Sequence, residues 1–261
     1  MFICIAATAA IVVLSIMFIL WLIQLKTKKA DIVDIAWSYN FAVIAILCYW
    51  IGNGFELRKA LIAFMVCAWS IRLGTYLYSR VMGHKEEEGR YKQLREDWKG
   101  SVNAKFFAFF MFQGILNVIL SLPFFIISTN TSPEIHWLEW TGFSIWLVGI
   151  IGESTADQQL KRFKSNPENK GKVCTYGLWN YSRHPNYFFE WTMWMAYFCF
   201  ALATPYGWIS VICPAMMLFF LLKVTGIPMT EELAVKTKGE AYLEYQRTTS
   251  MFVPWFKKSA K

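Results

Sequence analysis

Long apolar stretches alternate along the chain with short segments that carry almost all of its Lys and Arg. The stretches are about 15 to 24 residues long, and at about 1.5 Å per residue the longer ones cross a hydrocarbon layer of about 30 Å as helices. They cover residues 2–25, 34–52, 60–82, 106–128, 137–151, 186–203 and 206–224. The fifth and sixth are short, so we expect those helices to continue beyond the membrane. The pattern predicts an all-α polytopic membrane bundle of about seven transmembrane helices.

Composition supports a membrane protein over a soluble one. Of 261 residues, 56% are hydrophobic and 17% are charged, whereas soluble domains have about 25% charged residues. This composition argues against disordered, collagen-like, disulfide-rich and nucleic-acid-binding proteins. The first apolar run has neither a basic leader nor a cleavage site, so we interpret it as a transmembrane helix. Without internal repeats, residues 1–261 are interpreted as one membrane domain.

The distribution of positive charge predicts the orientation. All of the 26 Lys and Arg except Arg58, Lys59 and Arg72 follow the first, third, fifth and seventh stretches or lie within the last three residues of one. The positive-inside rule then places the N-terminus outside and the C-terminus in the cytoplasm. The net charge of +8 therefore belongs to the cytoplasmic face. The positive-inside rule accounts for most of it, and the remainder forms a basic rim around a few acidic residues at membrane depth.

Metal binding is not expected. The six cysteines show no CxxC spacing, and the three histidines lie far apart in the sequence. Five of the cysteines fall within apolar stretches, as small buried hydrophobic residues do.

A ladder of charges continues from the fifth stretch. At about 100° per residue, Glu153, Asp157, Lys161 and Lys164 share one helical face that runs from membrane depth into the cytoplasm. Ion pairs on a solvated helix explain this pattern as well as a binding ladder does. Glu153 favours binding, because an acid at that depth requires a cavity or a partner.

A second group surrounds Pro185, which favours the start of a new helix. The N-terminal end of that helix, with Arg183 and His184, is suited to anionic groups. Within the helix, Asn186, Glu190 and Trp194 share a face.

An aromatic interface belt would explain Tyr187 and Trp191 equally well. It does not explain the carboxylate of Glu190 one turn inside the helix.

A third group lies in the N-terminal half, where Asp34 is at the cytoplasmic mouth of the second stretch and Arg72 and Tyr76 lie in the third. Arg72 needs an acceptor inside the bundle. An Asp34–Arg72 ion pair and a catalytic role for either residue carry equal weight.

Together these motifs resemble the bacterial DUF1295 family, which is similar to the C-terminal domain of steroid 5α-reductases. They are Asp-x-x-Trp at 34–37, Arg-Leu-Gly-x-Tyr-Leu at 72–77, Gly-Arg-Tyr at 89–91, the segment 183–191, and a tail from 226–228 through 240–242 to 252–255. The resemblance implies a seven-helix membrane reductase that takes NADPH from the cytoplasm and reduces a conjugated C=C bond of a lipid-like or steroid-like enone. It assigns residues 1–130 to the substrate and 137–261 to the cofactor.

The resemblance also implies roles for single residues. It puts Asp34 and Tyr76 at the chemistry, although the reductases use a Gln-Glu pair and a Tyr at the enone and here Trp69 occupies roughly the place of that Tyr. The resemblance implies cofactor binding by Asp157, Lys161, Lys164, Asn186, Glu190 and Trp194, with Glu153 in the place of an Asn. With the residues at the start of the helix after Pro185, the expected cofactor-binding residues are Glu153, Asp157, Lys161, Lys164, Arg183, His184, Asn186, Tyr187, Glu190 and Trp194.

Two other functions compete with the reductase. Isoprenylcysteine carboxyl and phospholipid methyltransferases, which use S-adenosylmethionine, resemble the same region through Arg183-His184-Pro185 and a following Glu231-Glu232. A scaffold or small transporter would instead use the deep acids for packing or ion passage. We expect a bacterial inner-membrane enzyme with its active site facing the cytoplasm, a substrate entering from the bilayer, and no nucleic-acid or obligate protein partner.

Overall fold

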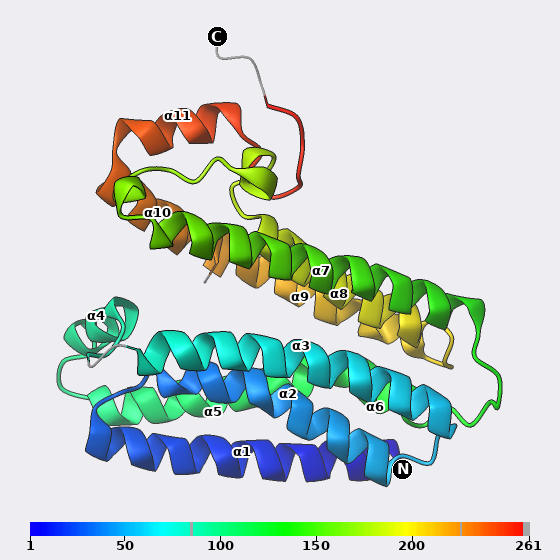
Figure 1. The fold of residues 1–261 in the computed structure, drawn as a ribbon. Helices are drawn as coiled ribbons and strands as arrows, with labels where there is room; N and C mark the ends of the chain where they lie inside the picture. Colours follow the sequence, from blue (N-terminus) through cyan, green and yellow to red (C-terminus); the bar gives the residue numbers. More distant parts are fainter. Residues whose placement is uncertain (84–85, 225, 258–261) are drawn as a thin grey trace. The chain divides into compact units, whose positions relative to one another are not determined.

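The computed structural model describes residues 1–83, 86–224 and 226–257, and within these ranges the protein is all-α without a strand (Figure 1). The helices form two compact units. Unit 1 comprises Met1–Ile135 with Thr204–Gly207, and unit 2 comprises His136–Ala203 with Trp208–Lys261. The first boundary falls between the residue ranges that we expected to serve substrate and cofactor.

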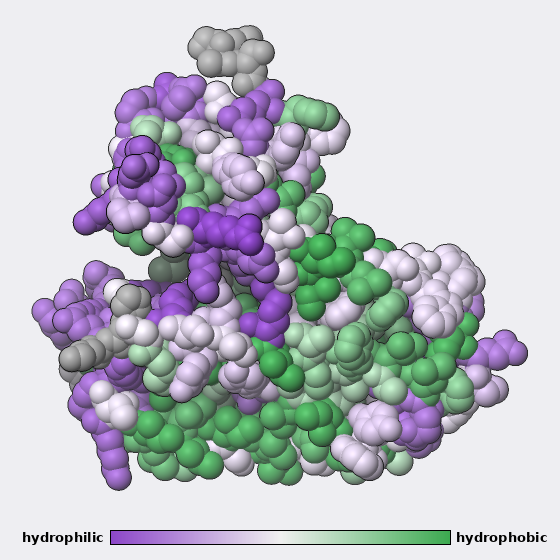
Figure 2. All heavy atoms as spheres, in the orientation of Figure 1, coloured by the Kyte–Doolittle hydropathy of each residue, from purple (hydrophilic) through white to green (hydrophobic). Residues whose placement is uncertain are grey.

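Unit 1 is built on three long helices that follow one another in the chain. Helix α1 packs against α2 and α5, and α2 packs against α3. Apolar side chains cover the exposed side of α1, whereas hydrophilic ones gather over α4 (Figure 2). The helices of this unit are α1 (Phe2–Thr27), α2 (Ile32–Ile51), α3 (Glu56–Met82), α4 (Gly89–Asp97), α5 (Val102–Leu120) and α6 (Leu122–Ile127).

Unit 2 is dominated by α7 and α8, which lie side by side (Figure 1). Helix α7 starts with a capping box, in which the Leu138 amide donates to His136 and Glu139 accepts from the His136 amide. The helical elements from here on are α7 (Trp137–Ser165), η1 (Pro167–Asn169), η2 (Gly177–Asn180), α8 (Pro185–Ala201), η3 (Gly207–Val211), α9 (Ile212–Phe219), the π-helical η4 (Phe220–Val224), α10 (Ile227–Lys238) and α11 (Glu240–Thr248).

Within the described ranges, 5 helical stretches are long and apolar enough to cross a membrane, which is compatible with an integral membrane protein. They are α1, α2, α3, α5 and the run Gly207–Lys238. Helix α8 has 17 residues, and the apolar part of α7 includes Glu139 and Glu153. The count of seven spans and the orientation of the termini therefore stay predictions.

The stretch at 106–128 is one place where the prediction was wrong. The structure divides it into α5 and α6 at Ser121. Pro123 lies in the first turn of α6, where its missing N–H costs nothing, and it cannot continue the preceding helix. The expected continuation of the fifth stretch is confirmed, since α7 runs without a break to Ser165.

Arg58 and Lys59 of unit 1 are buried and hydrogen-bonded to main-chain carbonyls. Arg58 is 1% exposed, and its guanidinium donates to the carbonyls of Asn130, Ser132 and Glu134. Lys59 donates to the carbonyl of Gly52 over 3.0 Å. These two side chains satisfy main-chain carbonyls of the segment 130–134 and of the C-terminal end of α2, which accounts for their departure from the charge pattern of the other segments.

Candidate functional site

Helix α8 begins where the sequence predicts, at Pro185. The preceding residue, His184, has a non-helical φ of −138°, as expected before proline. Its amide donates to the hydroxyl of Ser182. The turn before α8 is therefore held by its own side chains, and it presents Arg183 and His184 toward α10.

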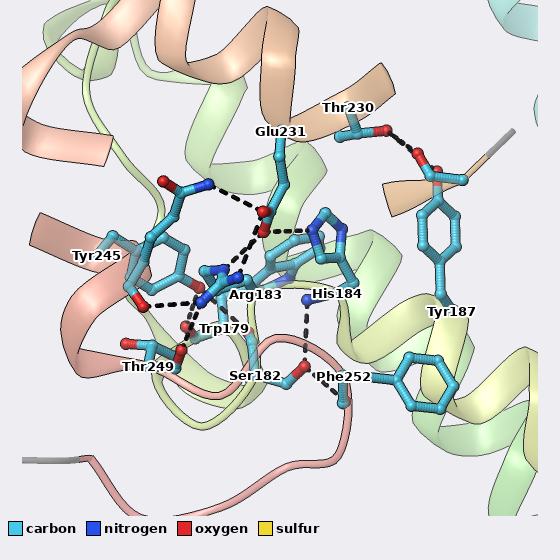
Figure 3. A network of polar contacts seen from close by, with 12 residues as sticks. Trp179, Ser182, Arg183, His184, Tyr187, Thr230, Glu231, Tyr245, Thr249 and Phe252 are labelled. Carbon is cyan, nitrogen blue, oxygen red and sulfur yellow. Dashed lines mark hydrogen bonds and ion pairs between the residues drawn. The ribbon is translucent and has the colours of Figure 1, made fainter. Parts of the chain in front are cut away.

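Glu231 of α10 joins these two side chains (Figure 3). Arg183 Nε lies 2.6 Å from Glu231 Oε1 and Arg183 Nη2 lies 3.3 Å from Oε2, an almost bidentate pair. His184 Nε2 lies 3.1 Å from Oε1, and the amide of Gln246 donates to Oε2 over 2.8 Å. The carboxylate is thus the hub of a largely buried network.

Main-chain carbonyls of α11 and the tail complete the surroundings of Arg183. Its Nη1 donates to the carbonyls of Gln246 and Thr249 over 2.9 and 2.8 Å. Tyr245 donates to the carbonyls of Trp179 and Ser182, and burial raises its pKa. All three guanidinium nitrogens of Arg183 are therefore engaged by protein acceptors, so this side chain organises the site more readily than it would bind a free anion.

Small residues let α7 approach α8 closely. A Cβ on Gly152 would lie 2.4 Å from the ring of Phe189, and one on Gly149 would lie 2.5 Å from Met193. Glycines on one helical face allow backbones to approach in this way. The close approach is what brings the polar faces of the two helices together.

At this interface the two predicted groups meet. The amide of Asn186 donates to Asp157 Oδ1 over 3.4 Å. Glu153, one turn deeper, is 3% exposed and Trp194 is fully buried, while Lys161 and Lys164 are exposed. Burial thus decreases along the ladder as expected, from the deep acid to the shallow bases.

The remaining predicted residues of unit 2 lie nearby. The ring of Tyr187 stacks on that of His184 at 5.5 Å between centroids, and its hydroxyl lies 3.5 Å from Thr230 Oγ1. Glu190 is half-buried on α8. Binding of a cofactor by any of these side chains stays a prediction.

In unit 1, Asp34 has a partner that sequence reasoning missed. The hydroxyl of Tyr91 donates to Asp34 Oδ1 over 2.7 Å, and Tyr91 is fully buried. Burial and the Asp34 charge hold the pKa of Tyr91 well above its usual range. Tyr91 belongs to the Gly-Arg-Tyr motif at 89–91, and this motif was the sequence feature that could have identified it. Tyr76 is 40% exposed on α3, and the pairing of Asp34 with Arg72 stays a prediction.

Comparison with known proteins identifies relatives of this chain. A chain of Schizosaccharomyces pombe described as uncharacterized is 24% identical over 268 residues, which cover 90% of this chain and 76% of the relative. A probable O-methyltransferase of Ustilaginoidea virens, ustE, is 38% identical over 96 residues, which cover 37% of this chain and 32% of that protein. No solved structure matches.

The family assignment rests on a wider match. The family model for DUF1295, described as a protein of unknown function, matches residues 20–249. This range includes every side chain of the Arg183–Glu231 network and of the α7–α8 interface described above. The chain therefore belongs to the DUF1295 family.

Proposed function

We propose that this protein is a membrane oxidoreductase that uses NADPH to reduce a conjugated C=C bond of a lipid-like or steroid-like enone, with its cofactor site open to the cytoplasm. The observation that carries the proposal is the contact of Asn186 with Asp157. This contact joins an amide from α8 to a carboxylate from α7, and two exposed lysines follow on α7. A dinucleotide has neutral, hydroxyl-bearing and anionic parts along its length, which an amide, a carboxylate and lysines can bind in turn.

The residues present fit NADPH in their chemistry. Lys161 and Lys164 are exposed and can pair with phosphates as point charges. The carboxylate of Asp157 can accept from ribose hydroxyls, and the Asn186 amide can both donate and accept. Arg183 would contribute indirectly, because its donors already hold Glu231 and the carbonyls of α11.

NADPH, when bound, would supply a hydride to the β-carbon of the enone. The chain itself would orient the cofactor through Asn186 and Asp157 and would exclude water through the buried surface around Trp194. The fully buried Tyr91, hydrogen-bonded to Asp34, would keep that acid in place. In this proposal Asp34 and Tyr76 act near the substrate carbonyl, where an acidic group stabilises enolate charge. A proton then adds to the α-carbon of the enolate and completes the reduction.

A methyltransferase that uses S-adenosylmethionine is the second candidate. The observation that favours it is the hydrogen-bonded network of Arg183 and His184 with Glu231, because Arg-His-Pro and a later Glu-Glu are the features shared with membrane methyltransferases. The printed description of ustE as a probable O-methyltransferase points the same way. The ladder of Lys161 and Lys164 favours the reductase, since a polyphosphate needs cations more than S-adenosylmethionine does.

Binding of the cofactors distinguishes the two candidates. The purified protein in detergent is titrated with NADPH, NADH and S-adenosylmethionine while thermal unfolding is followed. We expect NADPH to raise the Tm, and we expect Asp157→Ala and Asn186→Ala to abolish that rise. Lys170→Ala, on an exposed residue beyond the end of α7, serves as the control and should keep it.

Stabilisation by S-adenosylmethionine alone would overturn the reductase proposal and support the methyltransferase. Turnover gives a second test in the same protein. Asp34→Asn should abolish reduction of an enone while the NADPH-induced rise in Tm persists. Loss of the folded state in Asp34→Asn would instead assign this carboxylate to structure.

A further inference from the structure

The tail after α11 exposes apolar side chains although it is firmly held. Met251, Val253, Trp255 and Phe256 are 40%, 50%, 68% and 75% exposed, and Tyr181 beside them is 43% exposed. We call these five residues the tail surface. Exposed aromatic side chains gathered in one segment are unusual for a surface that meets only water.

Hydrogen bonds fix the tail surface in position. The amide of Trp255 donates to the carbonyl of Tyr181 over 2.9 Å. The hydroxyl of Ser182 donates to the carbonyl of Phe252 over 2.8 Å, and the ring of Phe252 is buried against Trp191 and Phe188. Because Phe252 is buried, the residues around it are turned outward by the fold.

The level of the tail along α7 is also fixed. The indole of Trp179 donates to the carbonyl of Ala156 over 2.9 Å, and the amide of Leu178 donates to Gln159 over 2.8 Å. The tail is bonded to Tyr181 and Ser182, which follow directly, so it lies near the level of the turn of α7 at 156–159.

That turn is a boundary on α7. On its N-terminal side an exposed apolar stripe runs along the helix and ends at Ile151, which is 63% exposed. The other members of the stripe are Trp137, Trp140, Leu147 and Val148. On the C-terminal side, Lys161, Arg162 and Lys164 follow within two turns. A helix that crosses a bilayer changes from apolar to basic at the layer of lipid headgroups.

We propose that the tail surface docks into the headgroup layer of the surrounding bilayer on its anionic lipids. Trp and Tyr prefer this layer because one end of each ring is apolar and the other is polar. Lys257 follows directly and is exposed. Basic residues next to aromatic anchors match a negatively charged membrane surface.

A pocket of about 360 Å³ strengthens the assignment to lipid. Its lining includes the apolar side chains of Val253, Trp255 and Phe256 and the polar side chains of Arg183 and Gln246. A pocket lined by both apolar and polar side chains suits an amphiphile such as a lipid. Docking would also hold the carbonyl of Thr249, which accepts from Arg183.

The proposal rests on α7 crossing the membrane and does not depend on which cofactor binds.

The full chain is reconstituted in nanodiscs of phosphatidylcholine, with or without phosphatidylglycerol. A photoreactive benzoylphenylalanine replaces Phe256, and the crosslinked products are analysed by mass spectrometry. The matched control carries the same probe at Glu168, an exposed residue beyond the basic end of α7.

We expect Phe256 to give lipid adducts and Glu168 to give none. Adding phosphatidylglycerol should increase the adducts by up to roughly fivefold, the effect of one lysine at the anionic surface, and Lys257→Gln should reduce that increase. Adducts to another protein chain, or equal lipid adducts at both positions, would overturn the proposal. If the probe at 256 prevents folding, the same probe at Val253 gives the same decision.

Discussion

Replacement of Glu231 by Gln removes the charge at the hub of the site while keeping the shape of the side chain. In the folded protein the carboxylate accepts from Arg183, His184 and Gln246. The side chains of Arg183 and Glu231 are 9% and 14% exposed. The Glu231→Gln variant would therefore leave a buried guanidinium without its counter-charge.

The size of the effect follows from this burial. Removing one partner of a buried pair costs about 3 to 5 kcal/mol, and the partial exposure of both side chains favours the lower end, about 3 kcal/mol. For a protein of this size each kcal/mol lowers the Tm by about 2 to 4 °C. We expect thermal unfolding of the purified protein in detergent to show a Tm lower by roughly 6 to 12 °C.

The neighbouring residue provides the matched control. Glu232 pairs with Lys236 at the surface, where both side chains are more than two-thirds exposed. Glu232→Gln should leave the Tm unchanged, because exposed ion pairs contribute little. Equal Tm values for Glu231→Gln and Glu232→Gln would refute the assignment of Glu231 as the hub.

Three further predictions concern stability in detergent. Gly152→Ala should lower the free energy of unfolding by about 1 to 3 kcal/mol, because the added Cβ meets an α8 ring at 2.4 Å. Gly89→Ala, with open space at its Cβ, should not lower it in the same unfolding measurement. Tyr91→Phe should cost about 1 to 3 kcal/mol, because the half-buried Asp34 loses a donor, and a Tm equal to wild type would contradict this. Burial and the charges of nearby glutamates raise the pKa of Asp31, so the folded state binds the proton more tightly and stability should fall as pH rises through the folded pKa. Asp31→Asn should flatten this pH dependence and stabilise the protein at neutral pH, and an unchanged pH profile would argue against it.

The local features of the fold were largely predictable because they depend on neighbours in the sequence. Pro185 marks the start of α8, because its ring fixes φ and excludes a preceding helical turn. The helical spacing of the charged residues after the fifth stretch indicates that α7 continues beyond its apolar part. The break at Ser121 was missed because a proline in a long apolar stretch is tolerated in many membrane helices. The structure shows that here it separates two helices.

The site divides in the same way. Which residues share a face of α7 or α8 follows from the sequence, because the helical period is a local property. The contacts of Asn186 with Asp157 and of Tyr91 with Asp34 depend instead on how the helices pack. The same packing turns Glu231 inward and leaves Glu232 at the surface. Two adjacent glutamates are equivalent in composition, and they differ because α10 offers one of them to a buried arginine brought from 48 residues away. Such a partnership is fixed by the packing of whole helices, which no local pattern records.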